Sequence, residues 1–371
     1  MLDDAGVRVL QDTVVWSTFA IAFVLGAIMN RTHFCTMGAV SDIVNLHDWT
    51  RMRMWICAIG VAIVSTQSLH AAGIVDLSRT LYTGSSLTIA SYLLGGFLFG
   101  FGMVLASGCG SKTLIRMGSG SLKSLVVFIM IGLAAYMTLR GVFAPLRANV
   151  IDQTWRVELA AGQDLPRLLG GIEVGPILRM GLALLIGGAL IAFAFADRQF
   201  RRLDPILAGV GVGLAITALW WVSGALGHVA EHPQTLEEAF LATNSGQAES
   251  FSFVAPLAYS LELLLFWTDA SRFVSIGIAA VLGMVAGSAA YALATRSFRF
   301  EGFSGPEDTG NHLLGGALMG IGGVTALGCT VGQGLSGLST LAVGSLLVFV
   351  SIILGAVAAL HYQIWRVERM V

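Results

Sequence analysis

A glycine-rich apolar segment that ends in cysteine occurs twice in this chain, and this duplication restricts the fold more than any other feature. Residues 95–109 read GGFLFGFGMVLASGC and residues 315–329 read GGALMGIGGVTALGC, so nine of fifteen positions are identical. Pairs of glycine-interrupted hydrophobic segments at equivalent places in two halves of a chain are typical of membrane transporters, in which the substrate site lies between the repeats. The duplication therefore predicts two related halves around a central site.

Composition places the chain in a membrane. Of its 371 residues, 56% are hydrophobic and 12% are charged, whereas about a quarter of residues are charged in soluble proteins. We expect an all-α, polytopic membrane protein that is surrounded by the lipid bilayer. The formal net charge of −1, without a basic patch or tail, argues against a nucleic-acid partner.

The hydropathy pattern predicts about nine transmembrane helices, because a helix needs about 20 apolar residues to cross the bilayer core. A tenth apolar stretch, 251–267, is interrupted by Pro256 and Glu262. We expect this stretch to lie at the interface or to re-enter the membrane. The nine predicted spans lie near residues 14–30, 54–73, 87–108, 122–140, 177–196, 205–227, 273–295, 311–328 and 341–361.

The positions of Lys and Arg predict an orientation. With nine spans, five groups of these residues fall on one side, which the positive-inside rule makes cytoplasmic. The N-terminus is then outside and the C-terminus inside. We expect a single transport domain over 1–371, with inverted halves at 14–140 and 177–361 joined by the loop 141–176. The five groups are Arg51 and Arg53; Lys112, Arg116 and Lys123; Arg198, Arg201 and Arg202; Arg296 and Arg299; Arg366 and Arg369.

The four cysteines form no C-x-x-C pair, and no histidine stands at zinc-ligand spacing from them. This pattern predicts neither a disulfide framework nor a structural zinc site. Cys57 lies within a continuous apolar run, where a buried core thiol is the expected state. The remaining three, Cys35, Cys109 and Cys329, each stand where an apolar run gives way to polar residues.

The duplicated segments should end inside the membrane. The run from His312 to Gly328 has 17 residues and would reach about 25 Å, less than the ~30 Å core. Polar, glycine-spaced stretches follow Cys109 and Cys329, and their backbone could not face lipid unsatisfied. Both stretches therefore require a protein-lined or hydrated cavity, with each chain break forming a half-helix.

Such helix ends are suited to anions, because they present free N–H groups and the positive end of the helix dipole. Small residues next to the cysteines would let a bound ion approach the backbone closely. Positive charge accompanies only the first copy. The supporting residues that we expect around the thiols are Arg31, Gly108, Gly110, Lys112, Gly328, Thr330 and Gln333.

Each of these residues also has a plainer interpretation. Spacings such as Gly96 with Gly100 are first of all a close-packing pattern between membrane helices. Arg31, near the end of the first span, could extend its charged head to the interface, and His33 could be an interface residue bonded to backbone. Packing requires small residues at the segment ends, but it does not require a thiol in both copies.

Three motifs together, RTHFC at 31–35, ASGCG at 106–110 and LGCTVGQG at 327–334, resemble those of the YeeE/YedE family of membrane proteins, which take up sulfur compounds and include thiosulfate transporters. The likeness runs along almost the whole chain. It implies nine spanning helices with shorter half-helices in two pseudo-symmetric halves, and a narrow conduit lined by Cys35, Cys109 and Cys329.

By this resemblance the chain would carry thiosulfate or a related small sulfur anion across a bacterial cytoplasmic membrane, without a cofactor or metal. Thiol sulfur is soft and polarizable and suits the poorly hydrated sulfur end of such an ion. We see no sulfurtransferase-like domain of the kind that accompanies some relatives. A separate TusA-like cytoplasmic sulfur carrier is therefore a partner to consider.

Other functions compete with this interpretation. Transport of sulfite or a selenium oxyanion, or a channel for a small neutral solute, stays open. A membrane thiol oxidoreductase would need paired cysteines with one activated thiolate, whereas these occur singly. Scattered Met and His side chains could bind a transported metal but are usually core or interface residues. The sequence does not identify the driving gradient; Glu262 and Asp269 are the carboxylates nearest a possible span.

Overall fold

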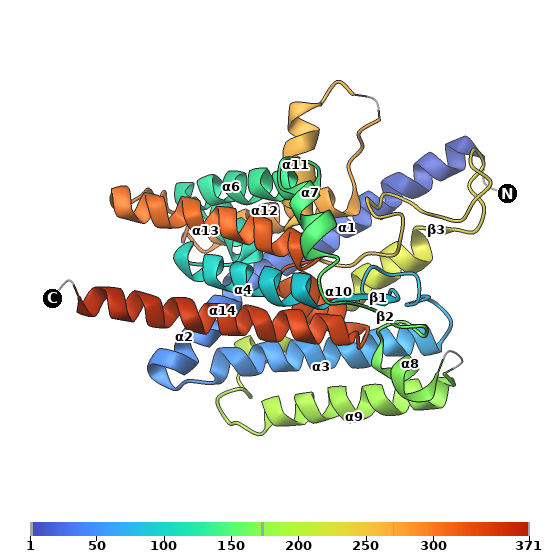
Figure 1. Ribbon diagram of the computed structural model, residues 1–371, viewed down its shortest axis with the longest axis horizontal. Coiled ribbons are helices and arrows are strands. Elements are labelled where there is room, and N and C mark those ends of the chain that lie inside the picture. The colour runs from blue at the N-terminus through green and yellow to red at the C-terminus, as the bar shows by residue number, and fades with distance from the viewer. Residues whose placement is uncertain (1–2, 172–173, 270, 370–371) are drawn as a thin grey trace.

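The computed structural model describes residues 3–171, 174–269 and 271–369, and most of them are helical. Figure 1 shows a bundle of long helices that run roughly alongside one another, with α1 beginning at one end and α14 finishing at the other. The all-α, polytopic architecture expected from composition is confirmed. The first six helices and the first strand are α1 (Asp4–Thr32), α2 (Thr36–Leu46), α3 (Thr50–Ala71), β1 (Ser86–Thr88), α4 (Ile89–Leu105), α5 (Gly110–Gly118) and α6 (Leu122–Leu139).

A connecting segment and a second set of helices complete the chain. The connection contains α7 (Ala144–Leu146), the π-helix η1 (Arg147–Ile151), β2 (Arg156–Glu158) and α8 (Leu165–Gly170). The second set contains α9 (Pro176–Phe195), α10 (Leu203–Trp221), η2 (Val222–Leu226), β3 (His228–Val229), β4 (Ala239–Phe240), α11 (Ala255–Leu265), α12 (Ile276–Ala294), α13 (Pro306–Thr325), η3 (Gly332–Gly337) and α14 (Val343–Glu368).

Eight helical segments of the described chain are long and apolar enough to span a membrane, compared with about nine expected. The predicted span 311–328 corresponds to α13, whose first turns carry Glu307, Asp308 and His312. The interrupted stretch 251–267 forms α11, which has 11 residues and would reach only about 16 Å. It is therefore too short to cross the bilayer, as its Pro256 and Glu262 suggested.

Helices α4 and α13, which carry the duplicated sequence, pack against each other through glycine in an antiparallel arrangement. A Cβ placed on Gly102 would lie 2.6 Å from the carbonyl oxygen of Gly315, and one on Gly315 would lie 2.6 Å from that of Gly102. At the other end of the contact, Gly95 and Gly322 face each other in the same reciprocal way. Because the early glycine of each copy meets the late glycine of the other, the two copies run in opposite directions.

The outer faces of these two helices also use glycine in matching positions. Gly100 of α4 lies against the backbone of Ile352 in α14, and Gly320 of α13 lies against the backbone of Ile131 in α6. Small residues let membrane helices approach until their backbones touch, which gains van der Waals contact where lipid offers no hydrophobic driving force. The close-packing interpretation of these glycines is therefore supported by the contacts.

The remaining long helices form a second group of pairs. Helix α1 packs along α12, while α3 packs against both α9 and α10. Glycine again marks the contacts, since Gly287 of α12 lies on the backbone of Phe23 and Gly213 of α10 lies on that of Ala58. Cys57 is fully buried and adjoins Gly209. The core-thiol interpretation of Cys57 agrees with this position.

The connection 141–176 fastens the beginning of α14. Strand β2 pairs with β1 in an antiparallel ladder. Further along, the amide of Val343 donates to the carbonyl of Gln163, and the amide of Leu165 donates to that of Leu341. Buried Asp164 also accepts a hydrogen bond from Arg179 of α9 at 2.9 Å. This loop, whose purpose the sequence does not reveal, thus holds α14 and α9 together.

Glu262 of α11 has its charge compensated. Its Oε1 lies 2.7 Å from Arg272 Nη1 and 3.4 Å from Arg140 Nη1, and it accepts a hydrogen bond from Tyr136 at 3.1 Å. A buried carboxylate with two cationic partners and a donor has a structural role that explains its presence. This arrangement anchors α11 between α6 and α12.

The glycine contacts make a stability prediction. Gly100→Ala would place a methyl group on the carbonyl of Ile352, and overpacking of this kind costs about 1–3 kcal/mol. The melting temperature of the detergent-purified protein should therefore fall. Gly188→Ala in α9 is the control, because a Cβ there meets nothing within 4 Å and alanine favours helix by up to about 1 kcal/mol. Equal melting temperatures for the two variants would contradict the close-packing account.

Candidate functional site

The same backbone break precedes Cys35, Cys109 and Cys329. Two residues before each cysteine the chain adopts a left-handed conformation, at His33 (φ 52°), Ser107 (φ 56°) and Leu327 (φ 56°). The next amide then closes the turn by donating to the carbonyl five residues back. These bonds join Phe34 to Met29, Gly108 to Met103 and Gly328 to Gly323. This pattern satisfies carbonyls at the end of a helix and turns the chain sharply.

Each cysteine then begins a short helix. Cys35 is the N-cap of α2 and Cys109 is the N-cap of α5. Cys329 precedes the helical residues 330–339, which include η3. The carbonyls of the three cysteines accept the first helical bonds, from the amides of Ala39, Thr113 and Gln333. A cysteine thus stands at each of three helix N-termini. Such N-termini carry amides without a helical partner and a partial positive charge.

The three thiols are buried, and none forms a disulfide. The amide of Gly38 donates to Cys35 Sγ at 3.4 Å, and the amide of Gly332 donates to Cys329 Sγ at 3.4 Å. Cys109 Sγ lies 3.2 Å from Ser111 Oγ. The sulfur atoms of Cys35 and Cys329 therefore make the capping contact that Ser or Asp make in ordinary N-caps, whereas Cys109 makes no such contact with a backbone amide.

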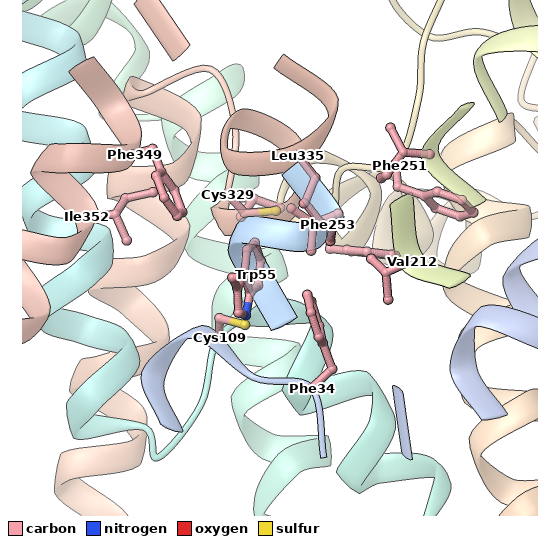
Figure 2. Close-up of a cluster of buried hydrophobic side chains, with 14 of the residues drawn as sticks. Phe34, Trp55, Cys109, Val212, Phe251, Phe253, Cys329, Leu335, Phe349 and Ile352 are labelled. Atoms are coloured by element: carbon pink, nitrogen blue, oxygen red, sulfur yellow. The ribbon is translucent and has the colours of Figure 1, made fainter. Parts of the chain in front are cut away.

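Cys109 occupies the middle position among the three. It lies close enough to both Cys35 and Cys329 for charges on these groups to interact. Figure 2 shows Cys109 and Cys329 on either side of Trp55, with Phe34 nearby. The aromatic rings of Phe34 and Trp55 stack at 4.6 Å between centroids. The chain thus brings Cys109 and Cys329 from distant segments beside one pair of stacked rings, and Cys35 directly follows Phe34, which is one of these rings.

Lys112 is the cation of this region. It lies in the first turn of α5, within electrostatic range of Cys35 and Cys109, and is partly buried. Among the described residues no carboxylate lies within ion-pair distance of its ammonium group. Arg31 differs, because its Nε lies 3.0 Å from Asp204 in an exposed ion pair. The structure therefore places Lys112, but not Arg31, beside the cysteines with an uncompensated charge.

Gln333 holds the second break together. Its Nε2 donates to the carbonyl of Ala326 at 2.8 Å, and its Oε1 accepts from Ser345 at 2.6 Å. A Cβ on Gly328 would lie only 2.9 Å from Gln333 Cγ, so glycine leaves the space that this side chain uses. Gln333 therefore supports the shape of the site with its amide already bonded.

The other small neighbours of the thiols have different surroundings. A Cβ on Gly108 would lie 3.0 Å from the Lys112 side chain, whereas one on Gly110 would lie 3.6 Å from Phe253, at ordinary contact distance. Thr330, directly after Cys329, is fully buried, and its hydroxyl has no hydrogen-bond partner among the described residues. The structure therefore leaves an unpaired hydroxyl at the start of the helix that follows Cys329.

A cavity of about 120 Å³ lies next to the break before Cys329. Leu327, the left-handed residue of that break, lines this cavity together with Tyr82. Glu249 also lines it and accepts hydrogen bonds from the amide and the hydroxyl of Ser245 at 2.9 and 2.5 Å. Burial raises the pKa of the Glu249 carboxyl above its ordinary value. No pattern in the sequence indicates this residue, because it lies in a loop between helices rather than beside a predicted span.

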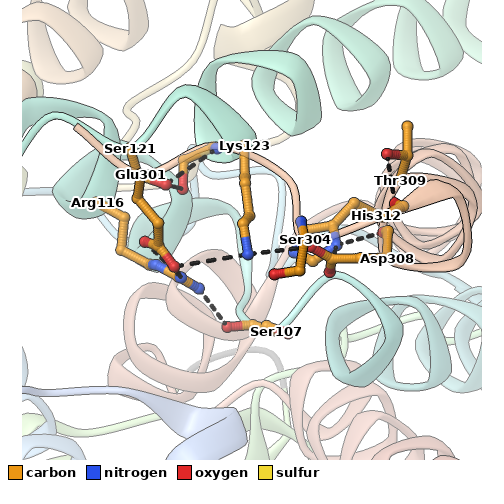
Figure 3. Close-up of polar contacts among 11 residues, drawn as sticks. Ser107, Arg116, Ser121, Lys123, Glu301, Ser304, Asp308, Thr309 and His312 are labelled. Carbon is orange, nitrogen blue, oxygen red and sulfur yellow. Dashed lines mark hydrogen bonds and ion pairs between the residues drawn. The ribbon is translucent and has the colours of Figure 1, made fainter.

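The charges at the far end of α5 are paired with one another. Arg116 Nη2 lies 3.1 Å from Glu301, and Lys123 Nζ lies 3.0 Å from Asp308. Figure 3 shows these groups joined with Ser107, Ser304 and His312 in one network. The network connects the start of α13 to α5 and α6. Within it, Glu301 compensates the charge of Arg116. In the described ranges no three His, Cys, Asp or Glu side chains form a metal-binding group.

Comparison with known proteins supplies the family. A family model described as sulphur transport matches residues 31–358. This chain belongs to that family. Among curated relatives, the thiosulfate transporter TsuA of Escherichia coli (strain K12) is 26% identical over 326 residues, covering 87% of each chain. The thiosulfate transporter TsuA of Spirochaeta thermophila (strain ATCC 700085 / DSM 6578 / Z-1203) is 24% identical over 356 residues, covering 92% of this chain and 97% of the relative.

The bonding of Gln333 makes a prediction about the site. Gln333→Ala removes both bonds that bridge the break and leaves the Ala326 carbonyl unsatisfied, which should cost about 1–3 kcal/mol and lower the melting temperature. Gln153→Ala is the control, since its amide makes one exposed bond to Ala148 at 3.3 Å and should melt like the wild type. A Gln333→Ala protein as stable as Gln153→Ala would show that this bridge does not hold the break.

Proposed function

We propose that this protein imports thiosulfate through a central path in which Cys35, Cys109 and Cys329 contact the ion in turn. The observation that carries the proposal is the gathering of three buried, unoxidised thiols at the N-termini of three short helices. The match to the sulphur transport family and the names of the two relatives support the choice of substrate.

The helix ends account for the charged end of the ion. Removal of a divalent anion from water is prohibitive unless fixed dipoles replace its hydration. The first-turn amides of α2, α5 and the helix 330–339, other than those of Gly38 and Gly332 that donate to the thiols, provide such dipoles. The ammonium group of Lys112 adds a full charge. These groups bind the oxygens of thiosulfate without a metal or cofactor.

The thiols account for the sulfur end. An S–H group is a weak donor, and its sulfur is soft and polarizable. Successive weak contacts allow an ion to move on, since conduction requires every site to release as well as bind. A single strong site would trap the ion instead. Thiosulfate passes unchanged in this mechanism, so no bond is made or broken and the protein acts as a transporter rather than an enzyme.

The domain organisation and orientation follow from the same proposal. Inverted halves near 14–140 and 177–361 are favoured by the antiparallel, reciprocal glycine contacts of α4 and α13, and the breaks before Cys109 and Cys329 lie at opposite ends of this contact. The protein would lie in a bacterial cytoplasmic membrane with its N-terminus periplasmic and its C-terminus cytoplasmic. A TusA-like cytoplasmic sulfur carrier would be a fitting acceptor of the delivered sulfur.

Substitution of the cysteines tests the proposal directly. We expect Cys109→Ala and Cys329→Ala to reduce uptake of radiolabelled thiosulfate into proteoliposomes at least tenfold, because each removes one contact in the path. Cys57→Ala, in a buried thiol packed against Gly209, is the matched control and should retain most uptake. Competition by unlabelled sulfite and sulfate in the same assay measures selectivity. Wild-type uptake by both site variants would refute the sulfur path.

The uncompensated lysine gives a second test. Lys112→Met should raise the thiosulfate concentration for half-maximal uptake roughly tenfold, as expected when one charged contact of about 1.5 kcal/mol is lost. The effect should shrink as salt increases, because exposed parts of the path are screened. Lys123→Met is the control, since Arg116 and His312 still accompany the carboxylates that Lys123 leaves. If the thiosulfate concentration for half-maximal uptake were the same in Lys112→Met and Lys123→Met, the result would argue against a role for Lys112.

A further inference from the structure

Three buried polar groups beside the cysteines have no hydrogen-bond partner among the described residues. They are the indole Nε1 of Trp55 and the hydroxyls of Thr36 and Thr330. All three side chains are at most 1% exposed. A buried donor left unpaired is destabilising, and native proteins rarely keep one without a reason. Their common location therefore requires an explanation.

The two threonines occupy equivalent places. Thr36 directly follows Cys35 as the first residue of α2, and Thr330 directly follows Cys329 at the start of the helix 330–339. Thr113 and Thr325, which are also buried, behave differently, because they bond their hydroxyls to carbonyls four residues back, at 3.0 and 2.8 Å. Residues in the first helical turn have no such carbonyl within their own helix, so the hydroxyls of Thr36 and Thr330 are available to hydrogen-bond with a bound ion.

Trp55 reaches the same place from α3. Its ring is stacked on Phe34 at 4.6 Å and faces Phe349 at 6.0 Å, which fixes its orientation. Figure 2 shows the ring between the two labelled cysteines, with its nitrogen pointing toward the Cys109 side chain. No hydrogen bond joins this nitrogen to that sulfur. The other fully buried tryptophan, Trp220, bonds its indole N–H to Ser339 Oγ at 3.0 Å.

We propose that the Trp55 indole N–H, together with the hydroxyls of Thr36 and Thr330, binds oxygens of the transported sulfur oxyanion between the thiol positions. This inference rests on the proposed function and adds a specificity-determining set to it. An indole N–H donates only and has no accepting atom, so it favours an anion over water, a cation or a neutral sulfide. The stacked rings exclude water from the other side of the contact.

This arrangement divides the recognition of thiosulfate between two kinds of side chain. The thiols meet the terminal sulfur, whereas the indole and the hydroxyls meet the oxygens. An oxyanion without a terminal sulfur would use only the second set, and a sulfide would use only the first. The donors therefore set the affinity for the oxygen end, and their loss should affect half-saturation more than the maximal rate.

Trp55→Phe tests the proposal, because it keeps the stacked ring and removes the N–H. In proteoliposomes we expect the thiosulfate concentration for half-maximal uptake to rise about tenfold or more, the usual effect of losing a hydrogen bond to a charged group. The melting temperature of the substrate-free protein should not fall, since no bond is lost. Thiosulfate should also stabilise the variant less than the wild type against heat.

Trp220→Phe is the matched control. It removes an indole N–H that is bonded within the protein, so the melting temperature should fall while half-saturation stays within twofold of wild type. If Trp55→Phe does not yield folded protein, Thr330→Val decides, with Thr325→Val as its control: half-saturation should rise only in the former, and stability should fall only in the latter.

The outcomes separate this inference from the proposed function. Normal thiosulfate uptake by the wild type with unchanged half-saturation in Trp55→Phe, or in Thr330→Val where that variant decides, would overturn the donor set and leave the transport function standing. Equal rises in the variant and in its control would indicate general loosening and would also overturn it. Absence of thiosulfate uptake by the wild type would refute the proposed function, and the donor set would fall with it.

Discussion

The structure depends on one constraint, that backbone N–H and C=O groups inside a membrane must be bonded within the protein. A helix that stops halfway across exposes such groups, and each break here satisfies its carbonyls through the same left-handed turn at His33, Ser107 and Leu327. On the other side of each break the first amides of a short helix have no helical carbonyl to bond, and after Cys35 and Cys329 the thiol sulfur accepts one of them, from Gly38 and Gly332. Placing a cysteine there makes a polar, polarizable site from a position that would otherwise be a defect in the fold.

Glycine packing makes these breaks possible. Helices α4 and α13 touch through Gly95, Gly102, Gly315 and Gly322. Their antiparallel contact sets the two broken ends at opposite ends of the pair, with Ala106 beside Gly315 and Ala326 beside Gly95. The flanking helices α6 and α14 close the outer sides through the same kind of contact. The connection 141–176 then fixes the start of α14. The thiols are thus positioned by helices that pack closely, which suits the proposed path with its three successive contacts.

Much of this architecture could be predicted from the sequence. The short run before Cys329 and the polar, glycine-spaced stretch after it required a break at membrane depth, and the repeat required a second one at Cys109. The matching turn before Cys35 could not be predicted, because its left-handed residue is His33 and no glycine marks it. Trp55 lies in an unbroken apolar helix, so only the packing reveals that its N–H is unpaired. The pairing of Arg31 with Asp204 also depends on residues far apart in the chain.

The reciprocal contact of α4 with α13 limits how the molecule can move. A virtual Cβ on Gly102 or Gly315 lies only 2.6 Å from a carbonyl of the other helix, so a residue with a side chain at either contact would clash with backbone. These contacts therefore keep α4 and α13 in register. In the proposed path, opening and closing would then come from small displacements of the short helices and of the aromatic rings beside them, while α4 and α13 stay in place.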